Sequence, residues 1–201
     1  MKTSGRWLCA AAPGAAALFF LCLSLSAAWI PVKAELAQWL IERSWRAGTV
    51  GGSVTPPWPW ADTRPAAVLS VPRLDIRLFV LEGGSGRNLA FGPVFLDATL
   101  GGADRIISGH RDTHFRFLRE LRAGDLIRLT GQEGSRWFEV AGLEVVDSRT
   151  RELVIEPGVE RLGLVTCYPF DDPVAGGPLR YVVTALPLNR DTVRPRWPSS
   201  G

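Results

Sequence analysis

From residue 66 onward the chain consists of short apolar runs that turn residues separate. Most runs alternate apolar with polar positions or are rich in β-branched side chains, and both patterns are typical of β-strands. We predict strands at 66–71, 76–81, 105–108, 125–129, 136–146, 162–167 and 179–186. Glycine, proline, aspartate or asparagine occupies the segments between them. Strands this short and numerous indicate an all-β domain that forms a closed or nearly closed barrel.

Helical segments in this domain are expected to be few. Residues 115–121 predict one short helical turn, because Phe117, Leu118 and Leu121 would share a face. The glycine-rich segment 83–86 follows a strand, and we interpret it as a turn that opens no helix. It therefore does not predict a nucleotide-binding loop.

The N-terminal 30 residues have the pattern of a membrane segment. Lys2 and Arg6 precede a stretch without charges from Trp7 to Ile30. As a helix this stretch would be about 36 Å long, enough to cross a hydrocarbon core of about 30 Å. A cleaved signal peptide ending near Ala27 is the alternative. We favour an uncleaved anchor, and both interpretations export the domain.

Residues 31–65 are expected to link this anchor to the domain. Positions 33–46 have helical periodicity, and a glycine-rich and then proline-rich segment follows them. Trp58 and Trp60 in that segment are expected to pack on the flank of the domain. The predicted organisation is a cytoplasmic tip and anchor at 1–30, a linker at 31–65, a catalytic domain at 66–187 and a tail at 188–201.

Charge and composition exclude one class of function. The net charge is only +3, and the arginines are scattered among acidic residues. Because no basic stripe forms, we do not expect nucleic-acid binding. Lysine occurs only at Lys2 and Lys33, so residues 66–187 contain no side-chain amine of this type.

The candidate chemistry rests on three residue types at strand ends. Cys167 ends a predicted strand and is the only cysteine outside the apolar N-terminus, so the domain has no disulfide to form. His110 follows another strand, and His114 is the only other histidine. Arg180 begins the last strand. These side chains could supply a nucleophile, a proton carrier and a cation for oxyanion charge.

By spacing alone this constellation is a weak signal, because each residue more often has an ordinary structural role. The cysteine could be a small core residue, the histidine a solvated loop residue and the arginine a surface charge. One cysteine and two histidines give at most three metal ligands, so we expect no metal and no other cofactor.

Three motifs together resemble those of sortases. The first is the segment 109–112 with 115–118 and 121–127 after it, the second is 166–170, and the third is 180–185. They follow the family's order of histidine, cysteine and arginine at its usual spacings, over residues 66–187. Residues 56–62 and the short 168–170 loop resemble the branch found in Gram-negative bacteria. The segment 91–102 follows the family's glycine-proline pattern only loosely.

The resemblance implies an eight-stranded sortase-type β-barrel with short helices, preceded by an N-terminal transmembrane helix. It implies a cysteine transpeptidase in which Cys167 attacks the Thr–Gly carbonyl of an LPxTG-like sorting signal and forms a thioester. His110 would transfer the protons, and Arg180 would hydrogen-bond the substrate or the oxyanion. Thr166 and Tyr168, which flank the cysteine, would contact substrate.

Substrate recognition is expected in residues 147–161, before the cysteine strand. Leu153, Val154, Ile155 and Pro157 could form an apolar groove for Leu-Pro of the signal, or a turn buried in the core.

The implied partners are a substrate protein with a C-terminal sorting signal, an amine acceptor of unknown identity, and the membrane. The implied location is the inner membrane, with the domain on the periplasmic side. Two alternatives stay open, namely a cysteine peptidase that only hydrolyses and a non-catalytic tethered scaffold. An L,D-transpeptidase does not fit, because its cysteine follows Ser-x-Gly and precedes arginine.

Overall fold

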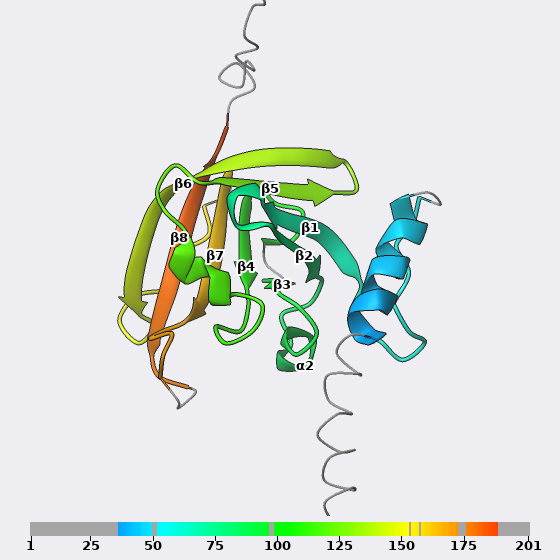
Figure 1. Ribbon diagram of the computed structural model, residues 1–201, viewed down its shortest axis with the longest axis horizontal. Coiled ribbons are helices and arrows are strands. Elements are labelled where there is room, and N and C mark those ends of the chain that lie inside the picture. The colour runs from blue at the N-terminus through cyan, green and yellow to red at the C-terminus, as the bar shows by residue number, and fades with distance from the viewer. Residues whose placement is uncertain are drawn as a thin grey trace, which may run out of the picture. The chain divides into compact units, whose positions relative to one another are not determined.

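The computed structural model shows a closed β-barrel (Figure 1). It describes residues 36–49, 52–96, 99–152, 154–156, 158–172 and 176–188. The strands are β1 (Pro65–Val71), β2 (Ile76–Leu81), β3 (Val94–Phe95), β4 (Asp104–Ser108), β5 (Leu126–Gly131), β6 (Gly134–Asp147), β7 (Arg161–Cys167) and β8 (Leu179–Pro187). Around the barrel their order is β1-β2-β3-β4-β7-β8-β6-β5. The predicted eight-stranded barrel is confirmed.

Seven of these strands match the predicted runs, and β3 is the addition. It has two residues, which is too short to show alternation, and it pairs with β2 through Val94 and with β4. The long strand β6 pairs with β5 along its first half and with β8 along its second. The register shifts between Val140 and Gly142. Such an irregularity bends a strand, which lets β6 serve both neighbours around the closed barrel.

Three neighbouring strands set up the site. Strand β7 lies between β4, which runs parallel to it, and β8, which runs antiparallel. The C-terminal ends of β4 and β7 and the beginning of β8 therefore meet at one end of the barrel.

Short helices connect the strands. They are η1 (Pro72–Leu74), α2 (Gly86–Leu89) and η3 (Arg116–Glu120). The expected helical turn at 115–121 is therefore present. The expectation that Gly83–Gly86 opens no helix was wrong, because α2 begins at Gly86. The Ser85 hydroxyl caps it by accepting a hydrogen bond from the Asn88 N–H at 3.3 Å, which offsets the weak helix propensity of glycine.

A helix over residues 36–49 precedes the barrel, where the periodicity predicts one over 33–46. Its Ile41 and Trp45 are buried with Val68 of β1 and Phe79 of β2. In the linker, Trp58 packs beside Phe91 with ring centroids 5.1 Å apart, as expected. Trp60 does not pack in this way, because 82% of its surface is exposed.

The main core fills the barrel with side chains from alternate positions of the strands. Leu69, Ile107, Leu164 and Val183 are fully buried there, together with Phe115 from the loop after β4. The predicted anchor at residues 1–30 lies outside the described residues. Among the residues that are described, no helix combines the length and the apolar character needed to span a bilayer.

Candidate active site

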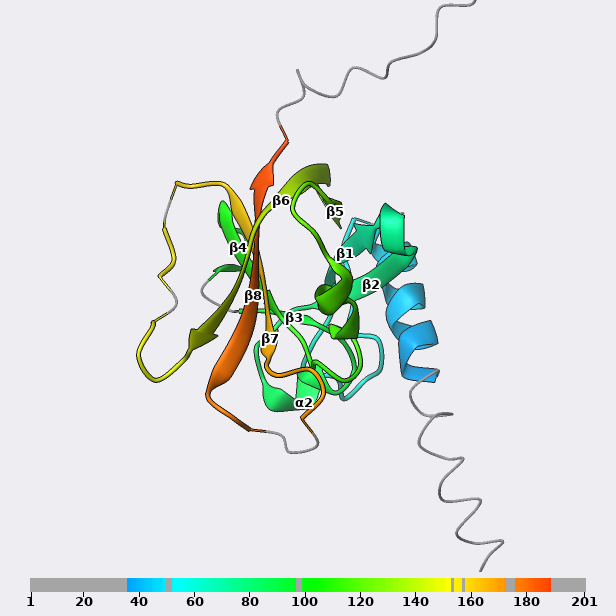
Figure 2. The same cartoon turned by 60° about the vertical axis from the view of Figure 1, so that its left-hand side comes forward.

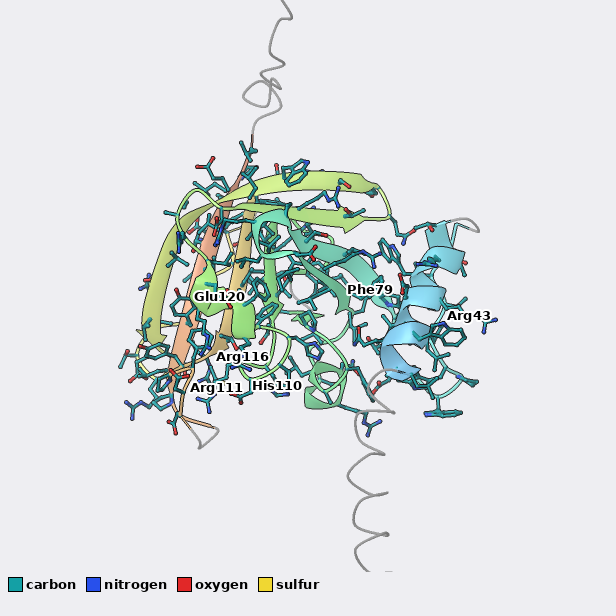
Figure 3. All side chains as sticks on the ribbon, in the orientation of Figure 1. Arg43, Phe79, His110, Arg111, Arg116 and Glu120 are labelled. Carbon is teal, nitrogen blue, oxygen red and sulfur yellow. The ribbon has the colours of Figure 1, made fainter. Side chains whose placement is uncertain are left out.

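The ends of β4 and β7 bring His110 beside Cys167. In the parallel ladder Ser108 pairs with Val165, and the Gly109 N–H donates to the Val165 carbonyl at 3.2 Å. His110 comes two residues after Ser108 and Cys167 two residues after Val165, so both residues lie near the same end of these two strands. Figure 3 shows His110 at the end of the barrel where β4 and β7 finish.

On the other side of β7, Cys167 pairs directly with Arg180 of β8. Side chains that lie opposite each other in an antiparallel ladder extend from the same face of the sheet. The thiol and the guanidinium therefore share a face at the same end of the barrel. Cys167 and Arg180 thus pair directly, and His110 lies in the loop that follows β4, the other neighbour of β7.

The shared face is the floor of a groove outside the barrel core. Within β7, Leu162, Leu164 and Thr166 are buried on the core side, whereas Gly163 and Val165 line a groove of about 510 Å³. By the same alternation Cys167 extends to the groove side. Its thiol is free and only partly buried. Arg180, Val182 and Thr184 of β8 continue the lining.

The segment between β6 and β7 borders this groove. Figure 2 shows it in yellow, standing to one side of the sheet that β4, β7 and β8 form. Val154 lines the groove and 64% of its surface is exposed, whereas Ile155 is half-buried and is not among the lining residues. Leu153 and Pro157, which were also predicted for the groove, lie outside the described residues.

A buried ion pair holds this segment against the barrel. Asp104 of β4, whose side chain is 1% exposed, accepts hydrogen bonds from Arg161 Nε at 3.0 Å and from its Nη2 at 2.5 Å. The carboxylate also accepts the Glu156 N–H at 2.9 Å, and Arg161 donates to the Val154 carbonyl at 3.0 Å. Burial alone would raise the pKa of Asp104, but these hydrogen bonds outweigh burial and lower it.

The two residues that flank Cys167 lie in different surroundings. Thr166 is 2% exposed, and its hydroxyl donates to the Gly109 carbonyl at 2.7 Å, which ties the histidine loop to the cysteine strand. Tyr168 belongs to an aromatic cluster with Phe170 and Tyr181. Burial, together with the neighbouring Tyr168, raises the pKa of Tyr181.

The histidine loop depends on Gly109. A Cβ atom at this position would lie 2.7 Å from Cγ of the buried Phe115 ring, so only glycine fits. The Phe115 N–H in turn donates to the His110 carbonyl at 2.9 Å. The His110 residue itself is exposed. The chain therefore turns sharply after β4 and leaves the imidazole accessible.

The second histidine lies in the same loop as His110 but is less exposed. His114 is partly buried, and its pKa is lowered mainly by burial and then by the charge of nearby His110. Asp112 accepts a hydrogen bond from Arg111 Nε at 3.3 Å.

Arg111 is the feature that sequence reasoning missed. It is 5% exposed, and its guanidinium donates to the backbone carbonyls of Pro169, at 2.6 Å, and of Asp172, both in the loop after Cys167. Figure 3 shows Arg111 beside His110. An arginine in a polar loop gives no signal of burial, and its acceptors lie 58 and 61 residues away in the sequence.

A model of the sortase domain matches residues 69–188 of this chain. The chain belongs to the sortase family. Sortases are cysteine transpeptidases. The barrel is thus that of a sortase domain.

Several known sortases resemble this chain. Sortase D of Bacillus subtilis (strain 168) is 30% identical over 122 residues, which span 59% of this chain and 61% of that protein. The match thus covers less than two thirds of that relative. The solved sortase A from Corynebacterium diphtheriae has a TM-score of 0.57 at 26% identity, over 69% of this chain and 67% of that one. Sortase C1 from Streptococcus agalactiae has a TM-score of 0.53 at 24% identity, over 62% and 68%, and supports the fold.

Proposed function

We propose that this sortase cleaves an LPxTG-like sorting signal between threonine and glycine and transfers the new carboxyl end to an amine. The observation that carries the proposal is the direct pairing of Cys167 with Arg180, which lines the groove, while His110 follows the end of the neighbouring strand β4 by two residues. The partly exposed thiol favours this function over that of a scaffold with a buried, inert cysteine.

The proposed reaction has two acyl transfers. The thiolate of Cys167 attacks the threonine carbonyl carbon, and the resulting tetrahedral oxyanion collapses as the C–N bond to glycine breaks. His110 gives a proton to the departing amine, and a thioester remains on the sulfur. An incoming amine then attacks the thioester carbonyl. His110 removes a proton from that amine, and the thiolate leaves as the new amide forms.

Arg180 suits the role of an oxyanion or substrate-backbone donor. Its Nη1 donates to the carbonyls of Gly177, at 2.6 Å, and Leu179, at 2.9 Å, which fixes the guanidinium plane at the groove end. Within the part of the chain that the structure describes, these are the only hydrogen bonds of this side chain. Its other N–H groups can therefore donate to a carbonyl oxygen in the groove.

The groove combines an apolar floor with charged residues at its border, among them Glu144, Arg151 and Glu152. Its floor has one apolar side chain from each of three strands, namely Ile106 of β4, Val165 of β7 and Val182 of β8, and Val154 borders it from the β6–β7 segment. Apolar contact of this kind is the physical basis for recognising the Leu-Pro part of the signal. Thr166 is buried and would affect substrate binding indirectly, because its hydrogen bond to the Gly109 carbonyl fixes the loop that carries His110.

The acceptor and the location belong to the same proposal. Because residues 66–187 contain no lysine, the accepting amine comes from another molecule or from a chain terminus. We propose that residues 1–30 anchor the protein in the inner membrane, with the domain on the periplasmic side, and that it belongs to the Gram-negative branch. Recovery of the intact N-terminus in membrane pellets supports the anchor, and a mature chain that starts near Ala28 refutes it.

Product analysis with a sorting peptide tests the function. We expect cleavage between threonine and glycine, and a new amide when an amine such as triglycine is added. The variants Cys167→Ala, His110→Ala and Arg180→Ala should each lose at least 10²-fold in kcat/KM, on the order expected for a nucleophile, a proton carrier or an oxyanion donor. Hydrolysis that no amine diverts would identify a peptidase. Absence of cleavage with an inert thiol would identify a scaffold.

A further inference from the structure

The buried guanidinium of Arg111 joins the two loops that carry the reacting groups. Arg111 directly follows His110, and its Nη1 and Nη2 donate to the Pro169 and Asp172 carbonyls, two and five residues after Cys167. Both N–H groups thus bind the backbone of the cysteine loop. A shift of either loop would break these bonds.

Burial of the Arg111 guanidinium is unfavourable by itself and must be offset by its hydrogen bonds. A guanidinium stays charged at every physiological pH, and taking it out of water is unfavourable unless its donors are satisfied. Arg111 also donates to the Asp112 carboxylate at 3.3 Å, but the Asp112 side chain is 66% exposed, and the Pro169 carbonyl accepts at the shorter distance of 2.6 Å. The geometry is that of a rigid fork holding two backbone oxygens. Lysine cannot reproduce it, because its single ammonium carries the charge at one point.

The imidazole of His110 has little else to fix its position. Among the described residues no side chain hydrogen-bonds it, and its backbone carbonyl is held by the Phe115 N–H. The position of the His110 ring therefore depends on the contacts that fix the backbone before and after this residue. Gly109, on one side, is tied to Thr166 of the cysteine strand. Arg111 holds the other side.

We propose that Arg111 is a positioning residue that sets the distance between the His110 imidazole and the Cys167 thiol. This inference rests on the proposed function, because it assumes that these two groups work as a pair. Misplacing a reacting group by about 1 Å costs on the order of 10²-fold in rate.

The chain provides a matched control. Arg119 of η3 joins the same cysteine loop by an ion pair with Asp171 at 3.1 Å, but these side chains are 37% and 90% exposed. An exposed pair holds its loop weakly, because water screens it and long side chains resist ordering. Arg119→Met therefore removes a similar contact without removing the buried fork.

The test measures how fast a small neutral reagent such as iodoacetamide alkylates Cys167. This rate needs no sorting peptide, so failure of the proposed transpeptidation leaves the measurement intact. An imidazole within hydrogen-bond reach can take the thiol proton as the sulfur attacks the reagent, which speeds alkylation. We expect Arg111→Met and Arg111→Lys each to slow it about tenfold or more when His110 is present. In the His110→Ala background, neither change should slow it further.

Four results would overturn the inference. In the first, Arg111→Met slows alkylation equally with His110 present and with His110→Ala, which indicates general damage to the site; in the second, it slows alkylation in neither background. In the third, Arg111→Lys keeps the wild-type alkylation rate. In the fourth, His110→Ala alone leaves that rate unchanged. Arg119→Met should keep the wild-type rate. If Arg111→Met does not fold by circular dichroism, the lysine variant, which keeps the charge, completes the cycle. In the peptide assay the Arg111 variants should lower kcat on the order of 10²-fold and leave KM within about twofold.

Discussion

Replacing Arg161 by methionine tests how the substrate groove is held. The change removes both donors to the Asp104 carboxylate, which is 1% exposed, and leaves it the Glu156 N–H alone. Breaking a buried pair in this way typically costs about 3–5 kcal/mol. Because the Arg161 side chain is 24% exposed, water already reaches the guanidinium, and we expect the lower end, about 3 kcal/mol.

The same change should loosen the groove. Arg161 also holds the Val154 carbonyl, and Asp104 holds the Glu156 N–H, so the bordering segment loses its attachment to the barrel. We expect the KM for a sorting peptide to rise and kcat to change less, because His110, Cys167 and Arg180 are unchanged.

Acidification gives this prediction a distinct signature. The pKa of Asp104 is lowered in the folded protein, so the pair stabilises the fold above the unfolded carboxyl pKa of about 3.9. That contribution is lost as pH falls through the folded pKa. In urea unfolding, the free energy of unfolding of Arg161→Met should therefore be about 3 kcal/mol below that of the wild type at pH 7, and this deficit should shrink below pH ~4.

Two further variants complete the experiment. Arg136→Met removes an exposed partner of Glu160 and should cost at most about 1 kcal/mol. Adding Asp104→Asn to Arg161→Met should recover part of the deficit, because no buried charge remains. A deficit below about 0.5 kcal/mol at pH 7, or one that stays constant down to pH 3, would refute the reasoning.

Three other predictions concern the frame of the site. Gly109→Ala sets a Cβ about 2.7 Å from the Phe115 ring, so it should lower the midpoint of thermal unfolding and the free energy of unfolding by about 1–3 kcal/mol. Thr166→Val leaves the Gly109 carbonyl without its donor and should cost about 1–3 kcal/mol in urea titrations, whereas Thr166→Ser should cost less. Hydrogen bonds from Arg73 lower the pKa of Asp125 more than burial raises it, so Asp125→Asn should destabilise the protein by about 1–3 kcal/mol at pH 7. That difference should begin to shrink as the pH falls below about 4 and should be lost below the folded pKa of Asp125.

How much the sequence predicts depends on the length of each signal. Alternation or β-branched apolar character over four or more residues identified seven strands, whereas the two residues of β3 carry no period to detect. The helix at Gly86 was missed because glycine disfavours helices, and the cap from Ser85 that offsets this is a local hydrogen bond. The parallel pairing of β4 with β7, which brings His110 to Cys167, follows from the closure of the whole barrel and from no single segment.

The residues of the site also differ in how far the sequence predicts them. Cys167, His110 and Arg180 were predicted because thiol, imidazole and guanidinium at strand ends have few ordinary explanations once the family motifs are recognised. Arg111 has the appearance of any charged loop residue, and its role becomes visible only when distant carbonyls fold over it. Long-range contacts of this kind cannot be inferred from local pattern.

The most direct test of the account is the mass of the protein during turnover. Acid quenching of a reaction with a sorting peptide, followed by intact-mass and fragment analysis, should show the peptide's acyl part on Cys167 and nowhere else. Hydroxylamine should release it as the hydroxamate, and Cys167→Ala should gain no mass. Cleavage that proceeds without any acyl adduct on this sulfur, or that persists in Cys167→Ala, would contradict the claim that the thiol carries the acyl group.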